Sequence, residues 1–370
     1  MNKKIKHGLS LAIAIVVIGL FVYNNKSQSI SSEPIKIGAI LPLTGDVASY
    51  GQAGMAGIDA AVKEINNVGG INGRKIEIIY EDDKCDVKEG ASAANKLVNI
   101  DKVSVIVGGI CSGVVSAEIP IIEMSKTPMI ITGASRPDLT KNNDFIFRIY
   151  PSDNFQGEFA AKYVINQMNK NKVAVIYEKN GWSQGLYDVF TATFSKLGSD
   201  ILFEDSVAPN SLDFKAILAK VKIIDPEVIY APLNPKELIA FLKQAKEFGL
   251  KGKIIGGDMA ETDEVKQSGY AEGLLYTIGI INNPENFKQK INTLTGKDSN
   301  FMTVTAYDSV NILATIIKKV GTNNLKIKES LGKLDYKGVS SEKISFDSEG
   351  DIKDVAFEIR VIRDKTSVKY

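Results

Sequence analysis

A cysteine and a serine stand side by side on a glycine turn in the stretch VGGICSGV, residues 107–114. The turn lies between an apolar run, residues 103–107, and an amphipathic segment, residues 114–124. Three kinds of chemistry suit such a pair: nucleophilic attack, phosphate binding, and the gripping of a ligand by hydroxyl and amide groups. The remaining residues of the chain decide between them.

The nucleophilic reading needs a base within hydrogen-bond reach, and histidine is the usual one. The only histidine is His7, which lies in an N-terminal segment that we interpret as a targeting signal. Cys111 and Ser112 therefore have no histidine partner. The same observation removes histidine general acids and histidine metal sites. We expect no enzymatic activity and no cofactor.

The phosphate reading fails because the turn lacks the patterns GxxxxGK[ST] and GxGxxG. What remains is the start of a helix, where free backbone N–H groups and the positive end of the helix dipole favour a carboxylate. Ser112 is then either a carboxylate-binding hydroxyl or an ordinary N-cap residue. A second strand end, residues 131–137, offers the Ser135 hydroxyl and the Ala134 carbonyl near the same point.

The second half of the chain contains an acid and an aromatic residue that suit the rest of a ligand. Asp258 ends the apolar run 253–258 and either meets an ammonium group or is a solvated turn residue. Trp182, the only tryptophan, lies in a segment interpreted as a loop after a strand. It either stacks on a ligand or packs against its own lobe. The acid clusters 81–83 and 347–351 lack the spacing of a calcium loop, so we expect solvated turns and no metal site.

Short β-branched runs alternate with helical segments after Pro34. Near-continuous apolar strands between such helices indicate parallel sheets that are covered on both faces. The alternation restarts in mid-chain, so the predicted fold is α/β with two doubly wound lobes, joined through residues 145–151. Ligands of such sheets bind beyond the carboxyl ends of the strands. The predicted strands are residues 35–41, 75–81, 103–109, 128–133, 172–177, 227–233 and 253–258, with a strand-like ending at 355–362.

The N-terminus has the composition of an export signal. A basic head, residues 1–8, precedes the uncharged apolar run 9–23, which is shorter than the roughly 20 residues that span a bilayer. We expect cleavage after Ser29; the alternative is an uncleaved membrane anchor through residues 9–23. Outside the cytosol thiols tend to pair, so Cys85 and Cys111 are predicted to form a structural disulfide. With 45 Lys and Arg against 44 Asp and Glu, no basic surface is expected for nucleic acid.

Several long motifs resemble the exported leucine/isoleucine/valine-binding proteins that serve ABC transporters. They are IGAILPLTG (37–45), YGQAGMAGIDAAVKEIN (50–66), GGINGR (69–74), YEDDKCD (80–86), GICS (109–112) and AEGLL (271–275), and the resemblance covers about residues 34–362. It implies the type I periplasmic-binding fold, with two lobes joined by three crossovers at a hinge. Both cysteines fall where the amino-acid-binding members carry a disulfide. The implied division is a signal or anchor with its linker, 1–33; a first lobe, 34–150 and about 280–335; and a second lobe, 151–279 and about 336–370.

The resemblance also implies roles for single positions around an amino acid. Ser112 is assigned to the ligand carboxylate and Asp258 to the ammonium. The Ala134 carbonyl and the Ser135 hydroxyl match the positions that touch the ammonium and the carboxylate. Tyr50 is assigned to the cleft rim. Arg136 is an alternative to Ser135, because the motif matches there only with a one-residue gap. Trp182 and Leu233 stand where relatives carry aromatic residues, so these two positions concern the specificity for the ligand side chain.

The cost of taking a zwitterion out of water gives a physical reason for such a site. Hydroxyls and amides on one lobe and a carboxylate on the other replace its hydration, and binding across the hinge favours the closed form. The predicted function is capture of a free amino acid, branched-chain or otherwise apolar, by an extracytoplasmic monomer. The monomer delivers it to the permease and ATPase subunits of an ABC transporter. The alternatives are a membrane-anchored sensor of the same fold, and transport of an amide, urea or aromatic acid.

Overall fold

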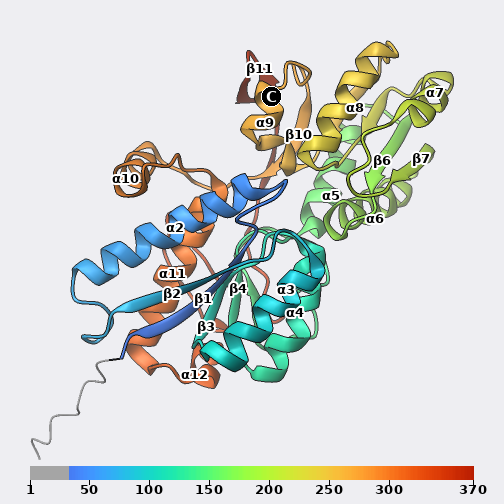
Figure 1. Cartoon of the computed structure of the whole chain (residues 1–370). Coiled ribbons are helices and arrows are strands. Elements are labelled where there is room, and N and C mark those ends of the chain that lie inside the picture. The colour runs from blue at the N-terminus through green and yellow to red at the C-terminus, as the bar shows by residue number, and fades with distance from the viewer. Residues whose placement is uncertain (1–32) are drawn as a thin grey trace, which may run out of the picture.

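The protein has two α/β lobes, each built on one mostly parallel sheet (Figure 1). The structure is a computed structural model that describes residues 33–370. The predicted export signal or anchor, residues 1–29, lies outside the described residues. Within residues 33–370, no helix combines the length and apolar character that a membrane crossing requires.

The first lobe contains a five-stranded parallel sheet in the order β2-β1-β3-β4-β5. Four of its strands are almost entirely buried because helices cover both faces, while the edge strand β2 is mostly half-buried. The strands are β1 (Ile35–Leu41), β2 (Ile76–Asp82), β3 (Val105–Gly108), β4 (Met129–Ile131) and β5 (Ile146–Arg148). The helices are α2 (Ala48–Asn67), α10 (Glu285–Thr295), α11 (Phe301–Val320) and α12 (Asn324–Leu331), and on the other face α3 (Val87–Asn95), η1 (Lys96–Asp101) and α4 (Ser112–Ser125).

The second lobe contains a seven-stranded sheet in the order β12-β11-β10-β9-β8-β6-β7. The two C-terminal strands form the antiparallel part of this sheet: β11 pairs antiparallel with β10, and β12 pairs antiparallel with β11. The strands are β6 (Val173–Glu178), β7 (Ile201–Val207), β8 (Val228–Tyr230), β9 (Lys253–Gly256), β10 (Leu275–Gly279), β11 (Phe357–Arg363) and β12 (Thr366–Lys369). The helices are α5 (Asp153–Lys162), η2 (Tyr163–Gln167), α6 (Gly181–Lys196), α7 (Lys215–Ile224), α8 (Pro235–Glu247), η3 (Asp258–Glu261) and α9 (Asp263–Gln267).

The chain passes between the lobes three times: after β5, after β10 and before β11. The predicted α/β fold with two lobes is confirmed, and each of the seven predicted strands is present. The runs that form β5, β7, β10 and β12 are not among the predicted strands. β7 lies at a sheet edge and alternates between half-buried and exposed residues, so it carries no continuous apolar signal.

The boundary expected near residue 335 falls later in the structure, because residues 336–353 lie against the first lobe. The buried Asp308 of α11 accepts hydrogen bonds from the backbone N–H groups of Val339 (2.9 Å) and Ser340 (2.7 Å). Ile352 N–H donates to the carbonyl of Arg148 at the end of β5 (3.0 Å). The third connection therefore crosses between residues 353 and 357.

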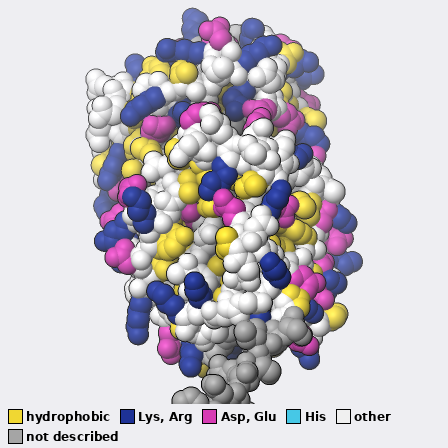
Figure 2. Space-filling model, turned by 90° about the vertical axis from the view of Figure 1, so that its left-hand side faces the viewer, with side chains coloured by type: hydrophobic (Ala, Val, Ile, Leu, Met, Phe, Trp, Pro, Cys, Tyr) yellow, Lys and Arg dark blue, Asp and Glu magenta, His cyan; other side chains and the backbone are white. Residues whose placement is uncertain are grey.

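The expectation that both acid clusters are solvated turns is wrong for one residue of each. Asp83 is fully buried, and burial raises its pKa to about 6. Asp351 is paired with the buried Arg148. Elsewhere charges of both signs are interspersed, as the face in Figure 2 shows, which agrees with the balanced composition.

Candidate functional site

The start of α4 holds the first predicted site residue. Ser112 is the first residue of that helix and is buried, with 1% of its surface exposed. Its Oγ accepts hydrogen bonds from the backbone N–H groups of Ser135 and Arg136, both at 3.2 Å. The N-cap alternative is wrong, because Cys111 occupies the N-cap position. The Ser112 hydroxyl thus joins the strand-end loop that follows β3 to the one that follows β4.

The loop after β4 brings Ala134 and Ser135 to the same place, and both are buried. The Ala134 N–H donates to the Gly109 carbonyl (3.0 Å), which fixes this loop against the glycine turn before α4. The Ser135 carbonyl accepts the N–H of Asp153, the first residue of α5 (2.8 Å). This loop is therefore in direct contact with a helix of the second lobe.

The acid predicted for an ammonium group is buried as well. Asp258 begins η3 and is 5% exposed, so it is not a solvated turn residue. Its Oδ2 accepts a hydrogen bond from the Tyr150 hydroxyl (2.5 Å), and its Oδ1 accepts one from Gln156 Nε2 (3.3 Å). Burial raises the pKa of Asp258, while these two hydrogen bonds oppose the shift. The Tyr50 hydroxyl, on α2 of the first lobe, donates to the Asp258 carbonyl (3.4 Å).

Trp182 lies in the first turn of α6 and not in a loop, and only 5% of its surface is exposed. Its ring packs against Gly257: a Cβ atom at that position would lie 2.7 Å from Trp182 Cζ2. The Trp182 indole nitrogen is near enough to lower the pKa of Asp258, although it has no hydrogen bond of normal geometry within the described chain. Leu233 is fully buried in the hydrophobic core after β8.

Sequence reasoning missed four buried polar residues around Asp258: Tyr150, Asp153, Gln156 and Tyr230. Tyr230 ends β8, and the other three lie in or just after the first connection between the lobes. Two signals could have found them. Tyr230 is a polar residue in the middle of the predicted strand 227–233, and it ends the observed strand β8. Asp153 and Gln156 are three residues apart, which places them on one face of a helix.

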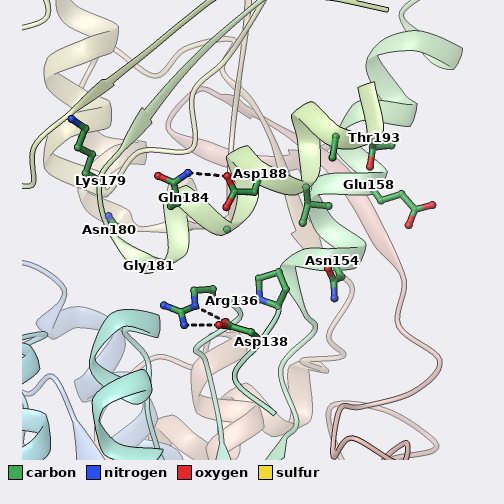
Figure 3. Close-up of a pocket in the computed structure, with 14 residues that line it drawn as sticks. Arg136, Asp138, Asn154, Glu158, Lys179, Asn180, Gly181, Gln184, Asp188 and Thr193 are labelled. Carbon is green, nitrogen blue, oxygen red and sulfur yellow. Dashed lines mark hydrogen bonds and ion pairs between the residues drawn. The ribbon is translucent and has the colours of Figure 1, made fainter. Parts of the chain in front are cut away.

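The two lobes touch beside these residues. The ends of α4 and α6 approach so closely that a Cβ atom on Gly181 would lie 2.8 Å from the Gly113 nitrogen. Lys236 Nζ and Asp46 Oδ1 also pair across the lobes at 2.5 Å. A groove of about 1070 Å³ flanks the contact, with Arg136 and Asp138 on one side and the 179–188 segment on the other (Figure 3). Ser112, Ala134, Ser135 and Asp258 do not line this groove; they are buried at the lobe junction beside it.

A two-lobed α/β protein with a buried polar site at the lobe junction belongs to the class of ligand-enclosing binding proteins. The chain is a member of the periplasmic binding protein family, whose model matches residues 34–356. The resemblance carried by the sequence motifs is confirmed. A leucine-, isoleucine-, valine-, threonine- and alanine-binding protein of Pseudomonas aeruginosa is 30% identical over 366 residues, covering 96% of each chain. A Leu/Ile/Val-binding protein homolog of Brucella melitensis is 31% identical over 334 residues, covering 88% of this chain and 90% of that one.

Solved structures agree with this family. The leucine-binding protein LivK of Thermotoga maritima superposes with a TM-score of 0.84 at 26% identity, covering 91% of this chain and 97% of that one. LivJ of Streptococcus pneumoniae, solved with isoleucine, gives a TM-score of 0.82 at 27% identity and covers 91% of this chain and all of that one. A benzoate complex from R. palustris, 19% identical with a TM-score of 0.81, shares the fold and covers 91% and 95% of the two chains.

Proposed function

We propose that this protein captures a free amino acid, branched-chain or otherwise apolar, between its lobes and delivers it to an ABC transporter. The single observation that carries the proposal is the placement of two opposite kinds of group at one buried junction. The Ser112 hydroxyl and the loop of Ala134 and Ser135 come from the first lobe, and the Asp258 carboxyl comes from the second. Donors on one side and an acid on the other match the two poles of a zwitterion.

The same arrangement explains why closure can serve as a signal. An amino acid held by groups from both lobes binds the closed form more tightly than the open form, so it shifts the population toward closure. Tyr50 supports this, because its hydroxyl reaches Asp258 across the junction. The permease and ATPase partners then respond to the closed form, which we take to be a monomer outside the cytoplasm, with no enzymatic activity of its own.

The remaining parts of the proposal concern the chain itself. The first lobe comprises residues 34–150 and about 280–353, and the second comprises 151–279 and about 354–370; Cys85 and Cys111 form a structural disulfide. Tyr50, Trp182 and Leu233 contribute to ligand enclosure and to side-chain specificity. Residues 1–29 serve as an export signal.

An aromatic acid is the competing ligand, since neighbours of this fold have been solved with benzoate and 4-hydroxybenzoate. The buried Asp258 argues against it, because a benzoate has no ammonium to compensate a second carboxylate in a site of low polarity. An amino acid supplies that charge.

A calorimetric and fluorescence titration tests the function. Trp182 is the only tryptophan and packs beside Asp258, so its emission reports on the site. We expect leucine, isoleucine or valine to change the emission and to bind with measurable heat, while benzoate and urea do not. The Asp258→Asn variant should lose at least about a hundredfold in affinity, since a buried charge pair is worth about 3 kcal/mol or more. Binding of benzoate with leucine inert would contradict the proposal.

A further inference from the structure

A second carboxyl group lies buried in the candidate site beside Asp258. Asp153 begins α5 and is fully buried, and its N–H donates to the Ser135 carbonyl of the carboxylate-binding loop. One turn further on, Gln156 donates to Asp258. The first turn of α5 therefore joins the Ser135 loop, through the backbone of Asp153, to Asp258, through the side chain of Gln156.

The polar atoms around this pair are not satisfied by the protein. Within residues 33–370, both carboxyl oxygens of Asp153, the Tyr230 hydroxyl and Gln156 Oε1 have no hydrogen-bond partner of normal geometry. The Ser135 hydroxyl is near enough to Asp153 to lower its pKa, but it lies outside that geometry. Buried polar atoms without partners are rare and costly, so their grouping at one place indicates an occupant. Ionised carboxylates accept hydrogen bonds only, so the occupant must donate. An ammonium group has three such donors, enough to serve Asp258 and Asp153 together.

The charges around the pair do not compensate two negative groups. Burial and the nearby Asp258 raise the pKa of Asp153 well above its ordinary value, opposed by the Ser135 hydroxyl and Arg148. The Arg148 guanidinium is already paired with Asp351. Burial raises the pKa of Asp258, and hydrogen bonds from Tyr150, Gln156 and Trp182 lower it. Burial, together with the charges of Asp153 and Asp258, raises the pKa of the Tyr230 hydroxyl. Two carboxyl groups that are buried together without a free cation favour the retention of one proton between them.

We propose that Asp153 is a second carboxyl group for the ligand ammonium, and that the Asp153–Asp258 pair releases a proton when the ammonium binds. The carboxylic O–H bond breaks, its proton passes to the buffer, and the intact ammonium takes its place between the oxygens. No bond of the ligand changes. This inference rests on the proposed function, because it needs an ammonium-bearing ligand in this site.

Proton release makes affinity depend on pH. While the free site holds the proton and the occupied site does not, each unit of pH decrease weakens the binding by up to about tenfold. A neutral-headed ligand would show no such dependence.

The test is isothermal titration calorimetry of leucine into the protein at pH 7 in phosphate and in Tris, two buffers with different ionisation enthalpies. We expect the difference in heat to correspond to release of about one proton per ligand. Asp153→Asn should bind about tenfold or more weakly and release markedly less. Glu158→Gln, a carboxyl-to-amide change on the same helix at a side chain that is 46% exposed, is the matched control and should behave like the unaltered protein.

Equal heats in both buffers for the unaltered protein would overturn the proposal, and so would an Asp153→Asn variant that keeps full affinity and proton release. The buffer comparison needs no variant, so it decides the matter even if Asp153→Asn does not fold. In both cases leucine still binds and the proposed function stands. Absence of any amino-acid binding is the separate outcome that removes the proposed function.

Discussion

Arg148 and Asp351 form a bidentate ion pair although 203 residues separate them in the sequence. Arg148 Nε donates to Asp351 Oδ1 at 2.6 Å, and Nη2 donates to Oδ2 at 2.8 Å. The remaining Nη1 donates to the Arg136 carbonyl (2.7 Å), and the Arg136 N–H donates to Ser112 Oγ. One buried guanidinium thus connects the segment before the third crossover to the loop that shapes the candidate site.

We expect Arg148→Met to lower the free energy of unfolding by about 3–5 kcal/mol, because it leaves Asp351 without its partner in a site that is 14% exposed. Urea unfolding at pH 7 measures this. Lys162→Met, which removes the exposed pair with Glu158, is the control and should change stability by less than about 1 kcal/mol. Replacing both Arg148 and Asp351 by apolar residues should recover part of the loss; an Arg148→Met protein of unchanged stability would contradict this account.

Ser112→Ala should destabilise the protein by about 1–3 kcal/mol, since two backbone N–H groups lose their buried acceptor. Ligand affinity should fall as well, because the carboxylate loses a hydroxyl donor. Thermal unfolding and calorimetric titration measure the two effects. Ser116 lies on the same helix and donates to the Ser112 carbonyl, so Ser116→Ala is the matched control with a smaller expected loss. Equal losses of stability and of ligand affinity in Ser112→Ala and Ser116→Ala would show that the Ser112 hydroxyl contributes no more than the Ser116 hydroxyl.

The disulfide between Cys85 and Cys111 closes a loop with a sequence separation of 26 and a Cα–Cα distance of 5.6 Å. Replacing both cysteines by serine should reduce the free energy of unfolding by about 2–4 kcal/mol, because the unfolded chain regains the entropy of that loop. Denaturant unfolding with and without a reductant checks this on the unaltered protein too. If the midpoint is the same in both conditions, the bond contributes nothing measurable.

Glu178 gives the stability a pH dependence of defined sign. This residue ends β6 and is 1% exposed; burial, with a contribution from Glu237, raises its pKa from 4.5 to about 7. A folded state that keeps a proton longer than the unfolded state is stabilised below the ordinary pKa and loses that contribution as pH rises through the raised one. The protein should therefore lose on the order of 2 kcal/mol from this group between pH 4.5 and about 7.

Glu178→Gln isolates that contribution from those of other buried acids, such as Asp83, whose pKa is also raised. The free energy of unfolding of the variant should fall less steeply from pH 5 to pH 8 than that of the unaltered protein. Glu158→Gln serves as the exposed control. Parallel pH profiles for Glu178→Gln and the unaltered protein would show that Glu178 is ionised in the folded state throughout.

The alternation of apolar and helical segments along the chain determined most of the fold. The run 35–41 is buried at every position but one, and its near-continuous apolar sequence indicates that burial directly. The same pattern placed Ser112 and Asp258 after strand ends, where ligands of such sheets bind. Their binding roles stay predictions, but their burial at one junction agrees with them.

Tertiary structure alone decided which distant residues meet. Asp153, Tyr230 and Asp258 come from three segments whose proximity depends on strand order and on the contact between the lobes, and no local periodicity encodes either. The pairing of Arg148 with Asp351 is of the same kind, as is the attachment of residues 336–353 to the first lobe through Asp308. Local sequence reports whether a side chain is buried, because that depends on its own polarity and spacing. The partner that satisfies a buried charge is set by the packing of the whole chain.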